Sequence, residues 1–405
     1  MTLCFLAAMI GFIALQPSGS PVLLMLLAIF WGHASTRASA FCVGFSYSAA
    51  TAATLTSALL SFFPGLFVGW TVSVWVVYAT IGGSAFAACW PSPSAPIVRR
   101  ISLGLALLVV LAVPPMGAVF WGHPVLAASE LFPSMGLAGI AATCALWSVL
   151  GALRLPLPYS SRLALNRPSN VANSSDLTAW LIAMVTVSLV VHSQYDFNEA
   201  QRVSQARDNN AMGVDFSLGR LATNQVAQYQ YLNSEVVPTV KAMAPLPGSV
   251  ILLPESIAGV NTAARLRWWR LELDDFFAQG GTLVMGENDV DGKGIGVVSN
   301  TGYRYFRARQ STPLAEWRPE SSYPSFGLWS NVATLRNGQR VALINCYEAL
   351  TVWPLLLDLA RDPDMLLFAS NQFWANGTRA PAAMSSAMAS WAKIAGVPLV
   401  SAINR

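Results

Sequence analysis

Charged residues are scarce in this chain of 405 amino acids, and they are unevenly distributed. Asp, Glu, Lys and Arg make up 11% of the sequence, against about 25% in an ordinary globular domain. Of the 24 basic and 20 acidic residues, six and two lie in residues 1–191, which leaves 18 of each sign in residues 192–405. We therefore expect a membrane bundle over 1–191 and a water-soluble domain over 192–405. The net charge of +4 is modest and forms no basic stripe, which argues against direct nucleic-acid binding.

Histidine and cysteine are nearly missing from residues 192–405. No histidine follows His192, which excludes a catalytic Cys–His pair and argues against a zinc site of His and Cys ligands. We expect no metal or other cofactor. Cys346 is the only cysteine after residue 191, so it has no disulfide partner in its own domain. The four earlier cysteines fall inside or at the ends of apolar stretches, where cysteine usually acts as a small packing residue.

Seven apolar stretches in the first part predict about seven membrane spans. They cover residues 3–15, 21–31, 40–63, 65–89, 101–121, 135–153 and 177–191. A membrane-spanning helix needs about 20 apolar residues, a length that the third to sixth stretches reach. The first two are short and flank a turn at 16–21, so they form either two thin spans or one re-entrant hairpin. A secretory signal is the less favoured alternative, because a basic n-region is missing.

The arginines of the first part lie in alternate connections between these stretches. Arg37 follows the second stretch, Arg99 and Arg100 follow the fourth, and three arginines at 154, 162 and 167 follow the sixth. Because short basic loops stay in the cytoplasm, we expect a cytoplasmic N-terminus and a second part outside the inner membrane, in the periplasm of a Gram-negative cell. No stretch carries a charged residue near its middle, which favours an anchor or lipid-facing platform over a transporter.

The second part alternates strands with helices, which predicts an α/β sandwich. Strands are expected at 249–253 and 282–286, as a hairpin within 294–310 that turns at 300–302, and at 341–345, 365–369 and 398–403; helices are expected at 217–244, 262–278, 350–361 and 382–394. Glu255 and Cys346 follow two of the strands. Cys346 is either a small core residue or a nucleophile. Glu255 is either a solvated loop acid or a general base.

Four short motifs occur in the order typical of one superfamily. They are Leu-Leu-Pro-Glu-Ser at 252–256, Pro-Leu-Ala-Glu-Trp at 313–317, Asn-Cys-Tyr-Glu at 345–348 and Ser-Asn-Gln-Phe-Trp at 370–374. Together they resemble the nitrilase (carbon–nitrogen hydrolase) superfamily. With its apolar first part, the chain resembles apolipoprotein N-acyltransferase. The layout of the whole chain is most similar to a group of plasmid-encoded conjugal transfer proteins related to that enzyme.

This resemblance implies an αββα sandwich and a set of catalytic residues. Glu255 would be the general base, Cys346 the nucleophile that forms a thioester, and Glu316 the second active-site glutamate. The neighbours of the acyl site would be Tyr347, Glu348 and Trp374. The implied reaction moves an acyl group from a membrane lipid to an amine, on a lipoprotein or another periplasmic acceptor.

The sequence departs from the superfamily at its catalytic lysine. That lysine stands five positions before the proline of the Pro-x-x-Glu motif, where this chain has Ala308. Arg307 and Arg309 are candidate substitutes, although a residue one step along a strand points to its opposite face. Lys293, within Asp-Gly-Lys-Gly at 291–294, is expected to be a solvated turn residue rather than one that swings inward.

Two hypotheses follow from this mixture of matches and departures. The first is an inner-membrane acyltransferase or amidase that works through a cysteine thioester and serves plasmid conjugal transfer. The second is a catalytically silent relative that acts as a structural or accessory component of the conjugation machinery. The motif residues favour the first hypothesis, and Ala308 favours the second.

Overall fold

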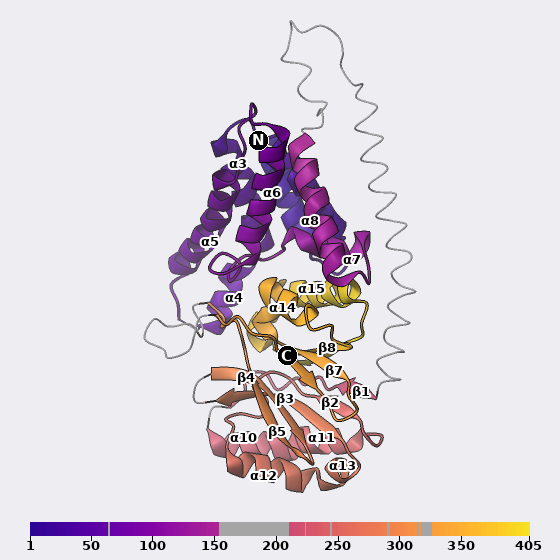
Figure 1. Cartoon of the computed structure of the whole chain (residues 1–405). Coiled ribbons are helices and arrows are strands. Elements are labelled where there is room, and N and C mark those ends of the chain that lie inside the picture. The colour runs from indigo at the N-terminus through magenta and orange to yellow at the C-terminus, as the bar shows by residue number, and fades with distance from the viewer. Residues whose placement is uncertain are drawn as a thin grey trace, which may run out of the picture.

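The computed structural model describes residues 1–63, 65–153, 210–222, 224–243, 245–289, 292–313, 316 and 326–405. A helical bundle lies at one end of the molecule and an α/β domain at the other (Figure 1). The seventh apolar stretch, the arginines at 154, 162 and 167 and the expected boundary at 191/192 all lie outside the described residues.

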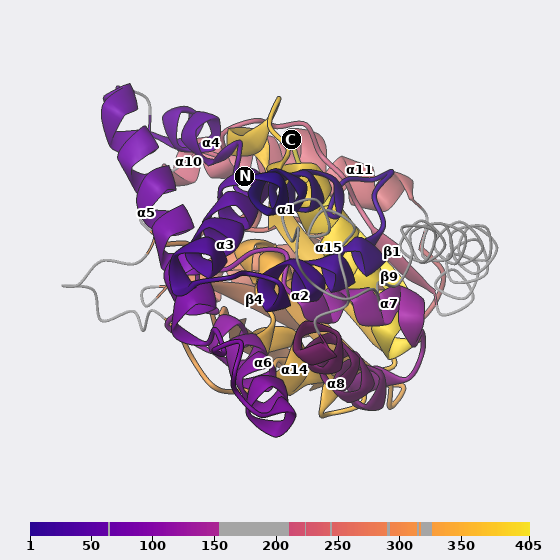
Figure 2. The ribbon, with the colours of Figure 1, turned by 90° about the horizontal axis from the view of Figure 1, so that it is seen from above.

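The bundle is built from helices that pack side by side, as the view from above shows (Figure 2). Its elements are α1 (Thr2–Ile13), η1 (Pro21–Leu23), α2 (Leu24–Gly32), α3 (Arg37–Thr51), α4 (Leu55–Phe62), α5 (Val68–Ala88), α6 (Ile97–Ala112), η2 (Pro124–Ala127), α7 (Ala128–Leu131) and α8 (Gly136–Leu153). Helix α3 packs between α1 and α5, and α8 packs against α2 and α6. Within the described residues, α5 and α8 are long and apolar enough to cross a membrane, judged by length and composition only. The expected count of seven spans is therefore not shown.

Two apolar stretches form shorter helices than we expected. Stretch 40–63 divides into α3 and α4, because the chain leaves the helical conformation at Ala52. Stretch 101–121 is helical only to Ala112, since Val113 is extended and two prolines without N–H donors follow it. Residues 113–123 form no helix and run to the α/β domain, where Trp121 contacts Tyr347.

The α/β domain contains two sheets. The first has the order β1 (Ala211–Gly213), β2 (Val250–Leu252), β3 (Thr282–Asp289), β4 (Gly292–Ser299) and β5 (Gly302–Arg307); the second has the order β6 (Val332–Thr334), β7 (Arg340–Asn345), β8 (Met365–Asn371) and β9 (Leu399–Asn404). Strands β1–β3 and β7–β9 run parallel, whereas β4, β5 and β6 join by antiparallel pairing. The hairpin of β4 and β5 turns at 300–301, close to where the sequence predicts it.

The two sheets pack face to face, and helices cover their outer faces. Leu252 and Val284 of the first sheet share a core with Leu343 and Leu367 of the second. The outer face of the first sheet is covered by α10 (Gln225–Tyr231), a π-helical turn η4 (Leu232–Val236), α11 (Val237–Ala242), α12 (Ala263–Glu272) and α13 (Asp274–Ala278). The second sheet is covered by α14 (Trp353–Leu359) and α15 (Ala380–Ala395). The described layers thus follow the expected αββα order.

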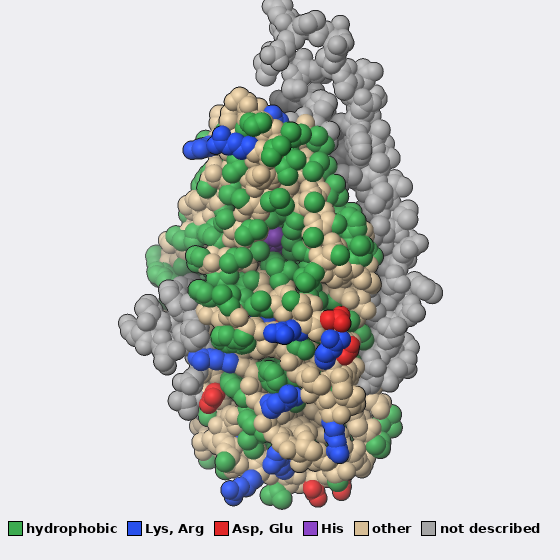
Figure 3. All heavy atoms as spheres, viewed as in Figure 1, with side chains coloured by type: hydrophobic (Ala, Val, Ile, Leu, Met, Phe, Trp, Pro, Cys, Tyr) green, Lys and Arg blue, Asp and Glu red, His purple; other side chains and the backbone are tan. Residues whose placement is uncertain are grey.

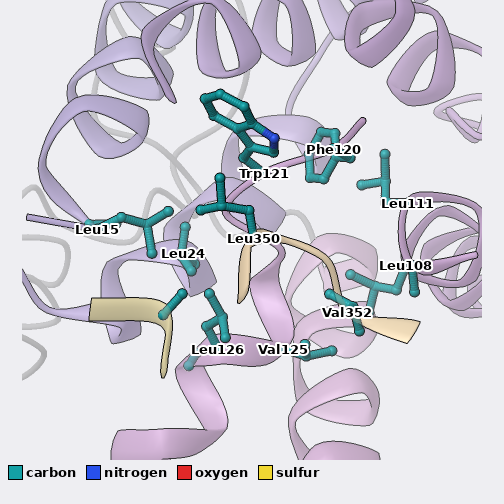
Figure 4. Packing of buried hydrophobic residues seen from close by; sticks show 14 of the residues in the cluster. Leu15, Leu24, Leu108, Leu111, Phe120, Trp121, Val125, Leu126, Leu350 and Val352 are labelled. Carbon is teal, nitrogen blue, oxygen red and sulfur yellow. The ribbon is translucent and has the colours of Figure 1, made fainter. Parts of the chain in front are cut away.

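The bundle and the α/β domain share one hydrophobic core. Trp121 and Leu126 of the bundle lie in the same cluster as Leu350 and Val352 of the domain (Figure 4). Helix α15 also packs against α7 and α8. Hydrophobic side chains are abundant on the visible face of the bundle, which has Lys or Arg side chains at its outer end, whereas charged side chains are spread over the α/β domain (Figure 3). The outer helices of the second sheet are therefore enclosed between that sheet and the bundle.

Candidate active site between the sheets and the bundle

Cys346 lies at the end of β7, where the strand meets the bundle. The apolar residues of β7 are fully buried, and Cys346 itself is 5% exposed. Its φ of +29° falls in a region that side chains with a Cβ rarely adopt. The Ser370 hydroxyl donates a hydrogen bond to its Sγ at 3.4 Å. Burial and the nearby Glu255 carboxylate raise the pKa of the Cys346 thiol well above its ordinary value, so the thiol is protonated at neutral pH.

Glu255 reaches the same place from the end of β2. Its side chain is buried, and its Oε2 accepts a hydrogen bond from the backbone N–H of Asn371 at 3.1 Å. Gly286 lies directly alongside, and a Cβ at that position would stand 2.3 Å from the Glu255 Cα. Only glycine therefore allows β3 to approach this closely. The solvated loop acid is excluded, and the geometry is that of a buried carboxylate beside a thiol.

Lys293 is the group that the sequence interpretation placed wrongly. It belongs to β4 and is not a solvated turn residue, since its Nζ lies 3.1 Å from Glu255 Oε1 and 2.6 Å from Glu316 Oε1. Glu316 Oε2 also accepts the N–H of Thr312 at 2.8 Å. Burial opposes the charged ammonium, but the Glu255 and Glu316 carboxylates outweigh it and raise the pKa of Lys293 well above its ordinary value.

Lys293 lies directly across the β4–β5 pair from Ala308. Gly294 pairs with Arg307, and the N–H of Ala308 donates to the Lys293 carbonyl at 2.9 Å. Opposite residues of an antiparallel pair present their side chains on one face of the sheet. The ammonium thus comes from the strand next to the one that the superfamily pattern uses. Counting outward from the turn at 300–301 pairs 308 with 293, so the sequence did contain the signal.

Neither flanking arginine takes the place of the lysine. Arg307 lies opposite Gly294, one residue out of step with Lys293 and on the other face of the sheet. Arg309 is buried with its Nη2 3.0 Å from Glu348 Oε2. Glu348 is fully buried against Arg309 and is not among the residues that line the cavity described next.

A cavity of about 1000 Å³ connects these groups to the bundle. Its polar end is formed by Glu255, Lys293, Glu316 and Cys346. Its opposite wall is apolar and comes from α4, α5 and the 113–123 segment, including Leu59, Phe62, Val77 and Val119. Tyr347 and Trp374 line it as well, and the Trp374 ring meets Phe62 edge-on at 6.0 Å. A carbonyl group that carries an apolar chain fits this combination.

The arrangement supports nucleophilic chemistry without a metal ligand set. Among the described residues there is no group of three His, Cys, Asp or Glu side chains that could hold a metal ion. The described site instead offers a thiol, a carboxylate that can accept its proton, and a cation beside them. A cation placed near a developing oxyanion stabilises it strongly in a site that excludes water.

Comparison with known proteins gives relatives over nearly the full length. No family model matches the chain. Conjugal transfer protein TraB of Agrobacterium fabrum is 26% identical over 407 residues, which cover 96% of this chain and 89% of that protein. The chain is similar to TraB. A probable conjugal transfer protein TraB of Sinorhizobium fredii is also 26% identical, over 93% of this chain and 90% of that protein.

Solved structures similar to this chain include amidases of the nitrilase superfamily. A cysteine-to-serine mutant of the Nesterenkonia amidase matches with a TM-score of 0.35 and 14% identity, over 48% of this chain and 75% of that one. The same amidase with acrylamide added at its active-site cysteine matches with a TM-score of 0.35 and 14% identity, over 48% and 77%. The expected similarity to plasmid conjugal transfer proteins is confirmed by the two TraB relatives.

Proposed function

We propose that this TraB-like chain is a membrane-anchored acyltransferase or amidase of the nitrilase type that serves plasmid conjugal transfer. One observation carries the proposal: the Lys293 ammonium contacts both Glu255 and Glu316 beside a buried cysteine. A structural relic would gain nothing from keeping two carboxylates, an ammonium and a thiol at the end of an apolar cavity. Burying such groups is costly unless they are paired or used.

In the first step the Cys346 sulfur attacks the carbonyl carbon of the acyl donor, and Glu255 takes the thiol proton. A C–S bond forms, and the carbonyl oxygen becomes an oxyanion that the Lys293 ammonium stabilises. The leaving group then departs as its bond to the carbonyl carbon breaks, and it receives the proton held by Glu255. An acyl thioester on Cys346 remains.

In the second step an amine attacks the thioester, and Glu255 accepts the proton that the amine loses. The C–S bond breaks, and the sulfur recovers that proton as the new amide leaves; water in place of the amine gives a carboxylic acid, which is the amidase outcome. Because the pKa of Cys346 is raised, proton transfer to Glu255 has to accompany the attack. Lys293 keeps its proton and supplies charge only.

The cavity wall supports a membrane lipid as the acyl donor. The residues of α4, α5 and the 113–123 segment offer an apolar surface that reaches Cys346, and burial of a hydrocarbon chain stabilises a complex by about 0.8 kcal/mol per CH₂ group. The acceptor would be the amine of a lipoprotein or of another periplasmic protein. Proteins of the conjugation machinery are the proposed partners.

We propose that the bundle lies in the inner membrane with its N-terminus in the cytoplasm and the α/β domain in the periplasm. Arginines in alternate connections support this orientation. Large apolar side chains on the outer surface of the bundle, such as Phe5, Leu105 and Val109, are exposed and would face lipid. This orientation would give Cys346 access to periplasmic acceptors.

The experiment is to label intact membranes with a thiol-reactive acyl probe and to measure plasmid transfer in parallel. Cys346→Ser should lose the label and reduce conjugation, whereas Cys42→Ser, which removes an exposed bundle cysteine, should do neither. The second candidate, a silent accessory component, is favoured by relatives named for transfer. A Cys346→Ser plasmid that transfers at the wild-type rate would decide for it.

A further inference from the structure

A buried ionic cluster lies directly behind the turn that carries Cys346. Arg309 Nη2 stands 3.0 Å from Glu348 Oε2, and its Nη1 stands 2.7 Å from Asp358 Oδ1, with all three side chains fully buried. Buried ion pairs usually stabilise a fold no better than apolar residues of the same volume. Stability alone therefore gives no reason for the cluster, and the steps of acyl transfer described above do not use it.

The hydrogen bonds of the cluster end on the backbone at both sides of the site. Glu348 Oε2 accepts the N–H of Asn345, the residue before Cys346, at 3.0 Å. Glu348 Oε1 accepts the N–H of Arg309, at the start of the segment that leads to Glu316, at 2.6 Å. The Glu348 carboxylate thus links the turn that carries Cys346 to the segment that leads to Glu316, the partner of Lys293.

Further contacts fix the arginine in turn. Its Nη1 donates to the carbonyl of Pro354 in α14 at 3.0 Å. Asp358 Oδ1 also accepts the N–H of Asn331 at 2.8 Å and the hydroxyl of Ser330 at 2.9 Å. The planar guanidinium, with donors in a fixed fork, can hold both carboxylates and a carbonyl at once, which an ammonium cannot do in the same geometry.

The turn needs such support because Cys346 has a left-handed backbone conformation, with a φ of +29°. A non-glycine residue keeps such a conformation only where its surroundings enforce it, and these conformations cluster at functional sites. We propose that Arg309, acting through Glu348, is a positioning residue that holds this turn and so aims the Cys346 thiol at Glu255 and Lys293. The catalytic purpose of this arrangement rests on the proposed function, but the alkylation test below does not require catalytic turnover.

The test compares Arg309→Lys, which keeps the charge and loses the fork, with Arg340→Lys as the matched control. Arg340 is an exposed arginine that pairs with Asp362 and Asp364 at the surface. In the full-length protein in detergent, alkylation of Cys346 by iodoacetamide is followed by peptide mass spectrometry from pH 6 to 10. Acylation of Cys346 by a thiol-reactive acyl probe and thermal unfolding are measured on the same samples.

With Arg309→Lys the relaxed turn should expose the thiol, so alkylation at pH 8 rises about tenfold and the pH profile moves down toward that of an ordinary thiol. Probe acylation, which needs the aimed thiol, should fall about 10²-fold, since a misplacement of about 1 Å can cost that much. Arg340→Lys should change neither. If the proposed function is wrong, acylation is absent in every variant while the alkylation profile still responds.

Should Arg309→Lys fail to fold, the triple variant Arg309→Met with Glu348→Gln and Asp358→Asn removes all three charges together and avoids an unpaired buried ion. The same rise in alkylation is expected from it. A folded variant of either kind with the wild-type alkylation profile would overturn the proposal. If neither variant folds, the cluster would be needed for the stability of the fold. That outcome would also overturn the proposal.

Discussion

Moving the ammonium from one strand to its neighbour would test the assignment of Lys293 most directly. In Lys293→Ala the carboxylates of Glu255 and Glu316 lose the cation that lies 3.1 and 2.6 Å from them. Loss of one group that stabilises an oxyanion lowers a rate by about 10²–10³-fold. We expect single-turnover acylation of Cys346 by an acyl probe to fall by that factor while the protein stays folded.

Adding Ala308→Lys to Lys293→Ala should restore much of this rate, because residue 308 faces residue 293 across the β4–β5 pair. Ala308→Lys alone should lower the rate, since Ala308 is buried and two ammonium groups would then share one site. Lys241→Ala, which removes a surface lysine paired with Glu272, is the control. Wild-type acylation in Lys293→Ala, or a double variant no faster than the single one, would refute the reasoning.

Three further outcomes follow from the same site and from the charge pattern. Glu255→Gln keeps the shape of the side chain but removes the proton acceptor, so acyl-thioester formation should fall about 10²–10⁴-fold; unchanged labelling in a folded variant would exclude Glu255 as the base. The pKa of the Cys346 thiol is raised in the folded protein, so its alkylation rate should still increase at pH values where the rate in the denatured chain is already constant. Identical pH profiles of the folded and denatured protein would contradict this. A phosphatase fused after Gly286 should be active outside the cytoplasm and one fused after Arg100 should not, whereas the reverse pattern would refute the proposed orientation.

The strand ends were predictable from the sequence because the buried strands are marked by continuous apolar runs. The run at 341–344 and the run at 365–369 became neighbouring parallel strands, and Cys346 directly follows the carboxyl end of β7, as expected. Strands β1 and β6 have three residues each, and they lack the continuous apolar run that marks the equally short β2. The division of stretch 40–63 into α3 and α4 was hidden as well, since small apolar residues continue across the break.

The two errors at the site have a common physical cause. We judged which cation reaches the site from its distance along the sequence, but strand pairing and burial determine where each side chain lies. Lys293 stands 15 positions before Ala308 in the chain yet faces it in the hairpin. Arg309 stands next to the expected lysine position, but its side chain pairs with Glu348, in the turn after β7, and with Asp358, in α14. Counting residues outward from the hairpin turn would have placed Lys293 opposite Ala308. No local sequence pattern predicts the pairing of Arg309 with Glu348 and Asp358.

The bundle contacts Tyr347, the residue that follows Cys346. The composition suggested that the two parts of the chain act separately, and this contact joins them. The Trp121 indole N–H donates to the Tyr347 hydroxyl at 3.0 Å, and that hydroxyl donates to the Ala118 carbonyl at 3.0 Å. The N–H of Trp121 in turn donates to the hydroxyl of Tyr78 in α5 at 3.1 Å. A chain of hydrogen bonds therefore runs from a helix of membrane-spanning length to the turn of Cys346. Because the same segment also lines the cavity, the bundle forms part of the candidate site.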